Sequence, residues 1–187
     1  MKKNLLISVL MTLVTTVLLG LIYPLVVTGL AQILFPDKAN GQLLRHDGVV
    51  IGSRILSQPF TGPGYFHPRA SAAGNGYDAT SSGGSNLGPT NQKLIDRVNA
   101  DVAAAQAENP GVPVPADLIT TSASGLDPEI SPAAADFQVP RIARERHLPE
   151  EALRLLIAQH TRDRFLGLLG EPGVNVLELN MQLDAGK

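Results

Sequence analysis

The hydrophobic residues of the chain fall into one long N-terminal run and several shorter periodic stretches. Between Leu5 and Phe35 no residue is charged, and most are Leu, Val, Ile, Thr or Ala. As a helix, this 31-residue run has a length of about 46 Å, whereas the hydrocarbon core of a bilayer is about 30 Å thick. The pattern therefore predicts that residues 1–36 contain a transmembrane helix, and Pro24 predicts a kink within it.

The fate and the orientation of this helix are separate questions. Gly29-Leu30-Ala31 provides a small-x-small pattern for signal-peptide cleavage. The apolar run is about twice as long as the apolar core of a signal peptide, which favours a retained anchor. Lys2 and Lys3 favour a cytoplasmic N-terminus, although basic residues such as Lys38 also follow the run and partly offset this preference.

Residues 37–187 are predicted to form a single compact soluble domain of the α+β class. Residues 41–56 contain short β-favouring runs around Val49–Ile51. Near the C-terminus, apolar side chains alternate with polar ones from Leu177 to Asp184, which is typical of a half-buried strand. Strands at both ends with helices between them predict a sheet that joins the two ends of the domain.

Three helices are expected between these strands. The first begins near Asn91 and ends at Asn109-Pro110-Gly111, and Ser131-Pro132 provides an N-cap and a first-turn proline for the second. Pro149 opens the third, which is expected to end before Gly167. Residues 118–121 are expected to be a short strand or an extended segment.

A long segment rich in glycine and proline separates the first strands from the first helix. Glycine and proline make up 11 of the 35 residues between Ser57 and Asn91. Such a segment is either disordered or an ordered functional loop. Tyr65, Phe66 and Tyr77 favour the ordered alternative, because aromatic side chains provide anchoring surface.

Composition and motifs exclude several classes of function. The chain has no cysteine, which excludes disulfides, thiolate catalysis and cysteine metal sites. Its formal net charge is −2, and no basic stripe is present, so a nucleic-acid partner is not expected. The four histidines share no metal-ligand spacing, and the chain has no nucleophile elbow and no Walker A motif. We therefore predict no catalytic residue and no metal site.

One segment is a candidate binding site. Ser82, Gly83, Gly84, Ser85 and Asn86 lie in a glycine-rich stretch that runs into the first expected helix. Converging backbone N–H groups and a helix N-terminus favour an anion such as a nucleotide phosphate. The alternative is a loop held by Ser and Asn side-chain hydrogen bonds to its own backbone.

A second unusual segment covers residues 122–132. It contains three serines, a glycine, an aspartate and two prolines at the start of a helix, which is typical of a rigid turn that ends in a cap. Asp127 and Glu129 offer carboxylates to a cation, but carboxylates so close to a helix start are more often caps. We interpret this segment as structural.

The motifs together resemble the KdpC family, the C subunits of Kdp potassium-transporting P-type ATPases. The likeness covers nearly the whole chain and includes, after the N-terminal span, SGGSNLGPTN at 82–91, TSASGLDPEISPAAA at 121–135 and VNVLELNMQLD at 174–184. The resemblance implies an accessory subunit without catalytic residues. It also implies a role as catalytic chaperone that raises the apparent ATP affinity of the pump subunit.

The partners implied by the resemblance are a channel-like potassium-binding subunit, the ATP-hydrolysing pump subunit and a very small membrane peptide. Potassium is then the ion transported by the complex, and ATP acts through the pump subunit. The resemblance also implies a single-pass protein of the inner membrane with its soluble domain outside. The alternative is an anchored or secreted envelope protein with an anion-binding loop, unrelated to potassium transport.

Overall fold

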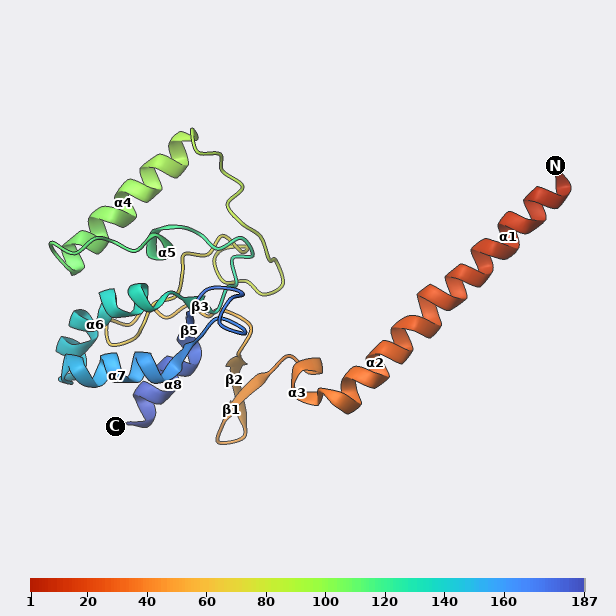
Figure 1. Cartoon of the computed structure of the whole chain (residues 1–187). Helices are drawn as coiled ribbons and strands as arrows, with labels where there is room; N and C mark the ends of the chain where they lie inside the picture. The colour runs from red at the N-terminus through yellow and green to blue at the C-terminus, as the bar shows by residue number, and fades with distance from the viewer. Residues whose placement is uncertain (187) are drawn as a thin grey trace. The chain divides into compact units, whose positions relative to one another are not determined.

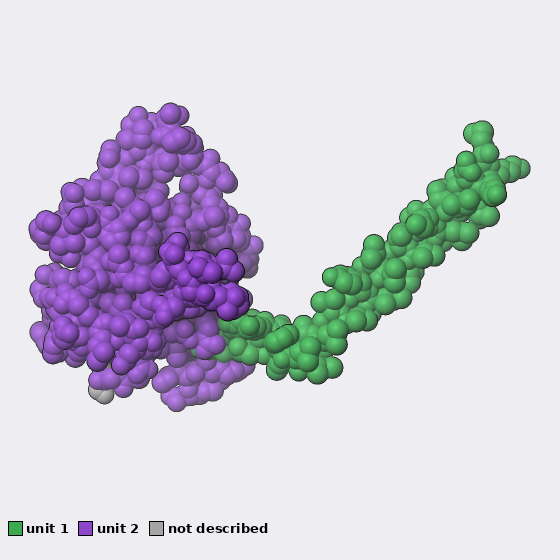
Figure 2. Space-filling view, in the orientation of Figure 1, with its two compact units in different colours: residues 1–44 green, residues 45–187 purple. Residues whose placement is uncertain are grey.

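The computed structural model describes residues 1–186, which separate into two compact units, residues 1–44 and the described residues from 45 onward (Figures 1 and 2). In the first unit, α1 (Lys2–Val17), η1 (Leu18–Ile22) and α2 (Tyr23–Leu34) form one continuous apolar helix. The short helix α3 (Pro36–Ala39) follows. The helix from Lys2 to Leu34 has a mean hydropathy of 2.6 and is long and apolar enough to cross a membrane.

The helix accommodates Pro24 through a turn of π-helix. A proline lacks the N–H that would bond to the carbonyl four residues earlier, here that of Gly20. The π turn η1 lies directly before Pro24, and the Tyr23 N–H bonds to the Leu18 carbonyl five residues back. The local widening of the helix is therefore found where the proline removes a bond.

The second unit is an α+β domain, as the sequence predicts. Strands β1 (Leu43–His46) and β2 (Val49–Ser53) form a two-stranded sheet. The remaining elements are α4 (Gln92–Glu108), α5 (Ala116–Ile119), β3 (Glu129–Ile130), α6 (Pro132–Arg146), α7 (Glu150–His160), β4 (Thr161–Arg162), β5 (Gly173–Asn175) and α8 (Val176–Ala185). The second sheet is antiparallel with the order β3-β5-β4, and Ile130 pairs with Val174.

The hydrophobic core lies between this small sheet and helices α6, α7 and α8. Its most deeply buried members come from these elements and from the long loop, and they include Phe66, Ile130, Ile142, Leu153, Val174 and Leu179. The apolar face of α4 is only half-buried, and Ile95 on it remains 39% exposed. The core is thus concentrated in the C-terminal part of the domain.

The predicted helix starts are confirmed. Asn91 caps α4 by accepting a hydrogen bond from the backbone N–H of Lys93, and Ser131 caps α6 by accepting one from Ala134. Helix α7 begins at Glu150, directly after Pro149, with Glu150 and Glu151 in its first turn. It ends at His160, earlier than Gly167, because the chain enters β4 there.

Three predictions about strands are wrong. Residues 176–185 form helix α8, because the buried positions Val176, Leu179, Asn180 and Leu183 also follow a helical period. Leu118 and Ile119 lie in the helical turn α5 and not in a strand. Consequently, within residues 1–186, no sheet joins the two ends of the domain: β1 and β2 pair only with each other, and the second sheet is built from β3, β4 and β5.

Candidate functional site

The candidate site is formed by the long loop of residues 57–91, which we call the glycine-rich loop. It contains no helix or strand, yet Phe66 and Ala73 within it are completely buried. The aromatic anchors therefore hold an ordered loop, which was one of the two alternatives left open by the sequence. It packs against the segment 122–128, so the two stretches singled out in the sequence lie together.

Backbone hydrogen bonds join the two stretches directly. The N–H of Gly83 donates to the carbonyl of Ser124 over 2.8 Å, and the hydroxyl of Ser82 donates to the same oxygen over 3.0 Å. Further along, the N–H of Ser57 donates to the Leu126 carbonyl over 3.0 Å. The SGGS motif is therefore engaged with the SASG motif at its backbone.

The glycines are required by this close approach. A Cβ on Gly84 would lie 2.9 Å from the carbonyl oxygen of Ala123. Gly125 has a φ of +68°, and a Cβ there would lie 2.6 Å from the N of Ala73 and 2.7 Å from the O of Gly83. By contrast, Gly83 has nothing within 4 Å of a Cβ position. Packing alone thus accounts for Gly84 and Gly125.

This geometry bears on the predicted anion site at Ser82, Gly83, Gly84, Ser85 and Asn86. An anion needs free N–H groups, but the Gly83 N–H is already bonded to Ser124. The carbonyl oxygens of Ala123 and Ser124 lie at the motif, and their partial negative charge repels a phosphate. The geometry favours a structural loop, although its hydrogen bonds reach a second segment instead of its own backbone. Anion binding by these five residues stays a prediction.

Two hydroxyl groups organise the middle of the glycine-rich loop. The Ser71 hydroxyl donates to the Gly125 carbonyl over 2.6 Å and accepts from the N–H groups of Ala73 and Tyr77. The Tyr77 hydroxyl donates to the Arg69 carbonyl over 2.9 Å. Burial raises the pKa of the Tyr77 phenol, which keeps this group protonated as a donor. These hydroxyl groups stabilise the loop through hydrogen bonds to backbone groups.

Asp127 has a structural role here. Its carboxylate pairs with Arg69 of the glycine-rich loop over 3.0 Å, and it accepts the N–H of Glu129 over 3.1 Å. Glu129 pairs with Arg162 over 2.6 Å. Both carboxylates that the sequence offered to a cation are thus engaged with arginines, in agreement with the structural interpretation of this segment.

Two buried amide side chains hold the first part of the loop against the helices. Asn180 of α8 accepts the N–H of Phe66 and donates to the carbonyl of the same residue, both over 2.9 Å. Gln138 of α6 likewise accepts the N–H of His67 over 2.8 Å and donates to the carbonyl of His67 over 3.1 Å. Asn180 is 1% and Gln138 2% exposed, so each amide replaces a missing strand partner inside the core. We call these two side chains the amide clamp.

Two arginines complete this attachment. Arg141 donates to the carbonyls of Pro63 and Tyr65, to the Gln138 side chain, and to Glu108 over 2.8 Å. Arg146 donates to the Gly64 carbonyl over 2.6 Å. Each arginine side chain is only 10% exposed, and its charge is compensated by several oxygen atoms.

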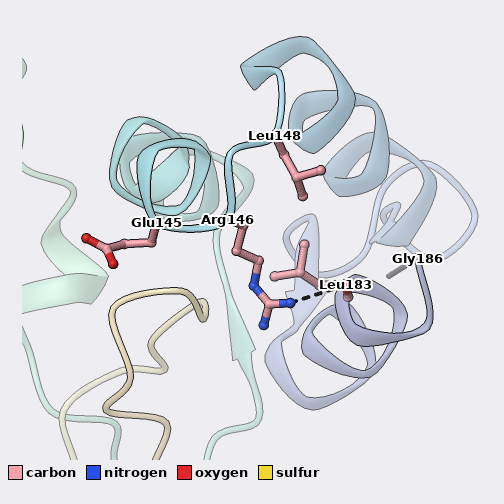
Figure 3. Close-up of a pocket in the computed structure, with 5 residues that line it drawn as sticks. All are labelled: Glu145, Arg146, Leu148, Leu183 and Gly186. Carbon is pink, nitrogen blue, oxygen red and sulfur yellow. Dashed lines mark hydrogen bonds between the residues drawn. The ribbon is translucent and has the colours of Figure 1, made fainter.

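Arg146 also borders a recess of about 380 Å³ between α6 and the end of α8, lined by Glu145, Arg146, Leu148, Leu183 and Gly186 (Figure 3). The guanidinium donates to the Leu183 carbonyl, whereas the Glu145 carboxylate points away from the other side chains (Figure 3). Arg146 further pairs with Asp184 over 2.8 Å and lies over the Tyr65 ring. The guanidinium of Arg146 is therefore engaged in contacts that attach the glycine-rich loop to α8.

His67, whose backbone is held by the amide clamp, is half-buried. Its ring nitrogen Nε2 lies 3.0 Å from the Gly62 carbonyl, and burial together with the charge of Arg141 lowers its pKa below the ordinary 6.5. Within residues 1–186, no group of three or more His, Asp or Glu side chains is placed to hold a metal ion. What the arrangement can do is present a rigid, preformed surface.

The sequence pattern does not single out the amide clamp or the two arginines. Their signals are weak: Asn180 is one of several polar residues that alternate with apolar ones, and its inward direction follows only once α8 is a helix. Gln138 and Arg141 are three residues apart and share a helix face, which places both towards the loop. Their partners in the glycine-rich loop lie between 71 and 114 residues away along the chain.

Comparisons with known proteins identify the family to which the chain belongs. A model of the KdpC family, described as K+-transporting ATPase, c chain, matches residues 5–185. The potassium-transporting ATPase KdpC subunit of Koribacter versatilis is 68% identical over 184 residues, which cover 98% of this chain and 95% of the relative. The KdpC subunit of Acidobacterium capsulatum is 60% identical over 95% of both chains, and that of Rhodopseudomonas palustris 53% identical over 100% of both. The chain therefore belongs to the KdpC family of potassium-transporting ATPase subunits.

Proposed function

We propose that the chain is an accessory subunit without catalytic residues of its own in a high-affinity, ATP-driven potassium uptake complex. It acts as a catalytic chaperone: it raises the apparent ATP affinity of the ATP-hydrolysing pump subunit and couples that subunit to the potassium-binding one. The observation that carries the proposal is the structural role of the two family motifs at 82–91 and 121–135. Their glycines and serines hold a loop by backbone contacts, as at Gly83 and Ser124, and so build a scaffold.

We further propose that residues 1–36 span the inner membrane and that residues 37–187 form a soluble domain outside the cytoplasm. Lys2 and Lys3 at the start of the apolar helix support a cytoplasmic N-terminus. In this orientation the domain is separated from ATP by the bilayer. Its effect on ATP affinity then passes through the complex as a coupling free energy between two sites.

The partners in this proposal are the channel-like potassium-binding subunit, the P-type pump subunit and a small membrane peptide. Potassium is the ion that the complex transports, and ATP is bound by the pump subunit. A rigid domain suits this role, because coupling between subunits requires surfaces that keep their shape while a partner moves. The amide clamp at Asn180 and Gln138 supplies that rigidity to the loop.

The decisive measurement is potassium-stimulated ATPase activity of the complex purified with and without this chain, across a range of ATP concentrations. We expect a higher KM for ATP in its absence. An unchanged KM and an unchanged maximal rate would refute the proposal.

A second measurement separates this function from direct nucleotide binding by the loop. Binding of ATP to the full chain alone is measured for the natural sequence and for Gly83→Ala, which the surrounding space accommodates. We expect no saturable binding in either case. Saturable binding that Gly83→Ala abolishes, and that the matched control Gly88→Ala leaves intact, would show a nucleotide site at residues 82–86.

A further inference from the structure

Residues 164–171, which join β4 to β5 and which we call the apolar tip, expose four large hydrophobic side chains. Phe165 is 65%, Leu166 77%, Leu168 81% and Leu169 62% exposed. By contrast, the leucines of the core are at most 6% exposed, and Leu153 and Leu179 are 1% and 0% exposed. A contiguous apolar group of this kind on the surface of a domain marks an interaction site.

The tip is preformed. Phe165 and Leu169 exchange two backbone hydrogen bonds of 2.8 and 2.9 Å, and the N–H groups of Gly167 and Leu168 bond back to Arg164 and Phe165. Leu166 and Gly167 have φ values of +53° and +74°, so the turn is tight. Because the tip is already ordered, little conformational entropy is lost when a partner covers it.

The strand that follows the tip, β5, is fixed to the chain just after β2. Asn175, at the end of β5, donates a hydrogen bond of 2.7 Å to the Arg54 carbonyl, one residue after β2. Arg54 also pairs with Glu178 of α8. The strand on the C-terminal side of the tip is thus held to the segment that follows β2.

The charges around the tip favour a protein partner over a lipid surface. Arg164 pairs with Glu171 over 2.6 Å across the base of the tip, and Arg162 pairs with Glu129 over 2.6 Å. Loops that bind anionic bilayers carry basic residues that remain available to the lipid headgroups. Here the nearby arginines are neutralised within the domain, and the exposed part of the tip is uncharged.

We propose that the apolar tip inserts into an uncharged, apolar pocket on another, membrane-embedded subunit of the same potassium-transporting ATPase. This inference rests on the proposed function as an accessory subunit. A few clustered apolar anchors that enter a desolvated pocket supply most of the binding energy in many interfaces. Phe165, Leu166, Leu168 and Leu169 have the composition and the rigidity of such anchors.

The absence of cysteine in the natural chain makes a single-cysteine test possible. Leu168→Cys is labelled with a polar maleimide in the full chain alone in nanodiscs, and again in the assembled complex. Val112→Cys, in the connection between α4 and α5, is the matched control, since Val112 is 42% exposed. We expect the labelling rate at position 168, divided by that at position 112, to fall at least tenfold on assembly.

Two results would overturn the inference. An unchanged ratio on assembly would show that no subunit covers the tip. A low ratio already in the chain alone in nanodiscs, which rises when the chain is transferred to detergent, would show a lipid contact instead.

A second variant tests the chemistry of the pocket. Leu166→Asp places a charge at a site that is 77% exposed in the isolated chain, so folding is preserved, but the charge is disfavoured in an apolar pocket. We expect less of the chain to be retained when the complex is purified, whereas Val112→Asp is retained normally. Equal retention of both variants would contradict the inference. The ATPase measurement on the natural complex tests the proposed function independently of these outcomes.

Discussion

Replacement of Asn180 by leucine tests whether the amide clamp stabilises the domain. The substitution keeps the size of the side chain but removes both hydrogen bonds to Phe66. The N–H and the carbonyl of Phe66 then remain in the core without partners, because Asn180 is 1% and Phe66 0% exposed. The free energy of unfolding is expected to fall.

The expected loss follows from opposing effects. Two unsatisfied buried backbone groups together cost roughly 2–6 kcal/mol. The buried leucine offsets about 1.5–3 kcal/mol of this. A net loss of about 2 kcal/mol is therefore expected, which at a urea m-value of about 2 kcal/mol/M corresponds to a shift of the midpoint by about 1 M.

The assay is urea unfolding of the detergent-solubilised full chain, followed by near-ultraviolet circular dichroism. The chain has three tyrosines and no tryptophan, and Tyr65 and Tyr77 belong to the glycine-rich loop. The matched control is Gln182→Leu, because Gln182 is exposed on the same helix. If Asn180→Leu shifts the midpoint no more than Gln182→Leu does, the clamp does not stabilise the fold and the reasoning fails.

Two further predictions concern the same loop. Gly125→Ala should destabilise the domain by more than 1 kcal/mol, because Gly125 combines a positive φ with a Cβ position 2.6 Å from the Ala73 backbone. Gly111 also has a positive φ but open space around its Cβ position, so Gly111→Ala should lower the free energy of unfolding less in the same urea assay. His67 has a lowered pKa in the folded state, so the unfolded state binds more protons below pH 6.5 and stability falls as the pH is lowered through that value. Urea midpoints at pH 7.5 and 5.5 should show a smaller loss in His67→Asn than in the natural chain; an equal loss would assign the pH dependence to other groups.

The helix boundaries of this domain could be predicted because their determinants are local. Asn91 and Ser131 bond to N–H groups two or three residues ahead, so the sequence around them contains the whole interaction. The same kind of signal was present at α8, where Asn175 caps the helix and Glu178 follows three residues later. The alternation of apolar and polar residues from Leu177 to Asp184 nevertheless favoured a strand, because a segment of ten residues is short enough to fit both a helical and a strand period.

The clamp could not be predicted for a different reason. Nothing near Phe66 indicates that its backbone is paired with Asn180, 114 residues further along the chain. A polar residue that alternates with apolar ones, as Asn180 does, is compatible with an exposed, a capping or a buried position. Only the packing of α6 and α8 decides between these positions, and that packing depends on the rest of the core.

The separation of Phe66 from its partner has a consequence for the order of folding. The glycine-rich loop is synthesised long before α8, because the side chain that satisfies the Phe66 backbone lies 114 residues further along the chain. Contacts between such distant residues form late and slow the acquisition of structure. A ribosome-bound or truncated chain that lacks α8 therefore leaves the backbone of Phe66 without its Asn180 partner, and we expect such an intermediate to be more prone to aggregation and proteolysis than the complete domain.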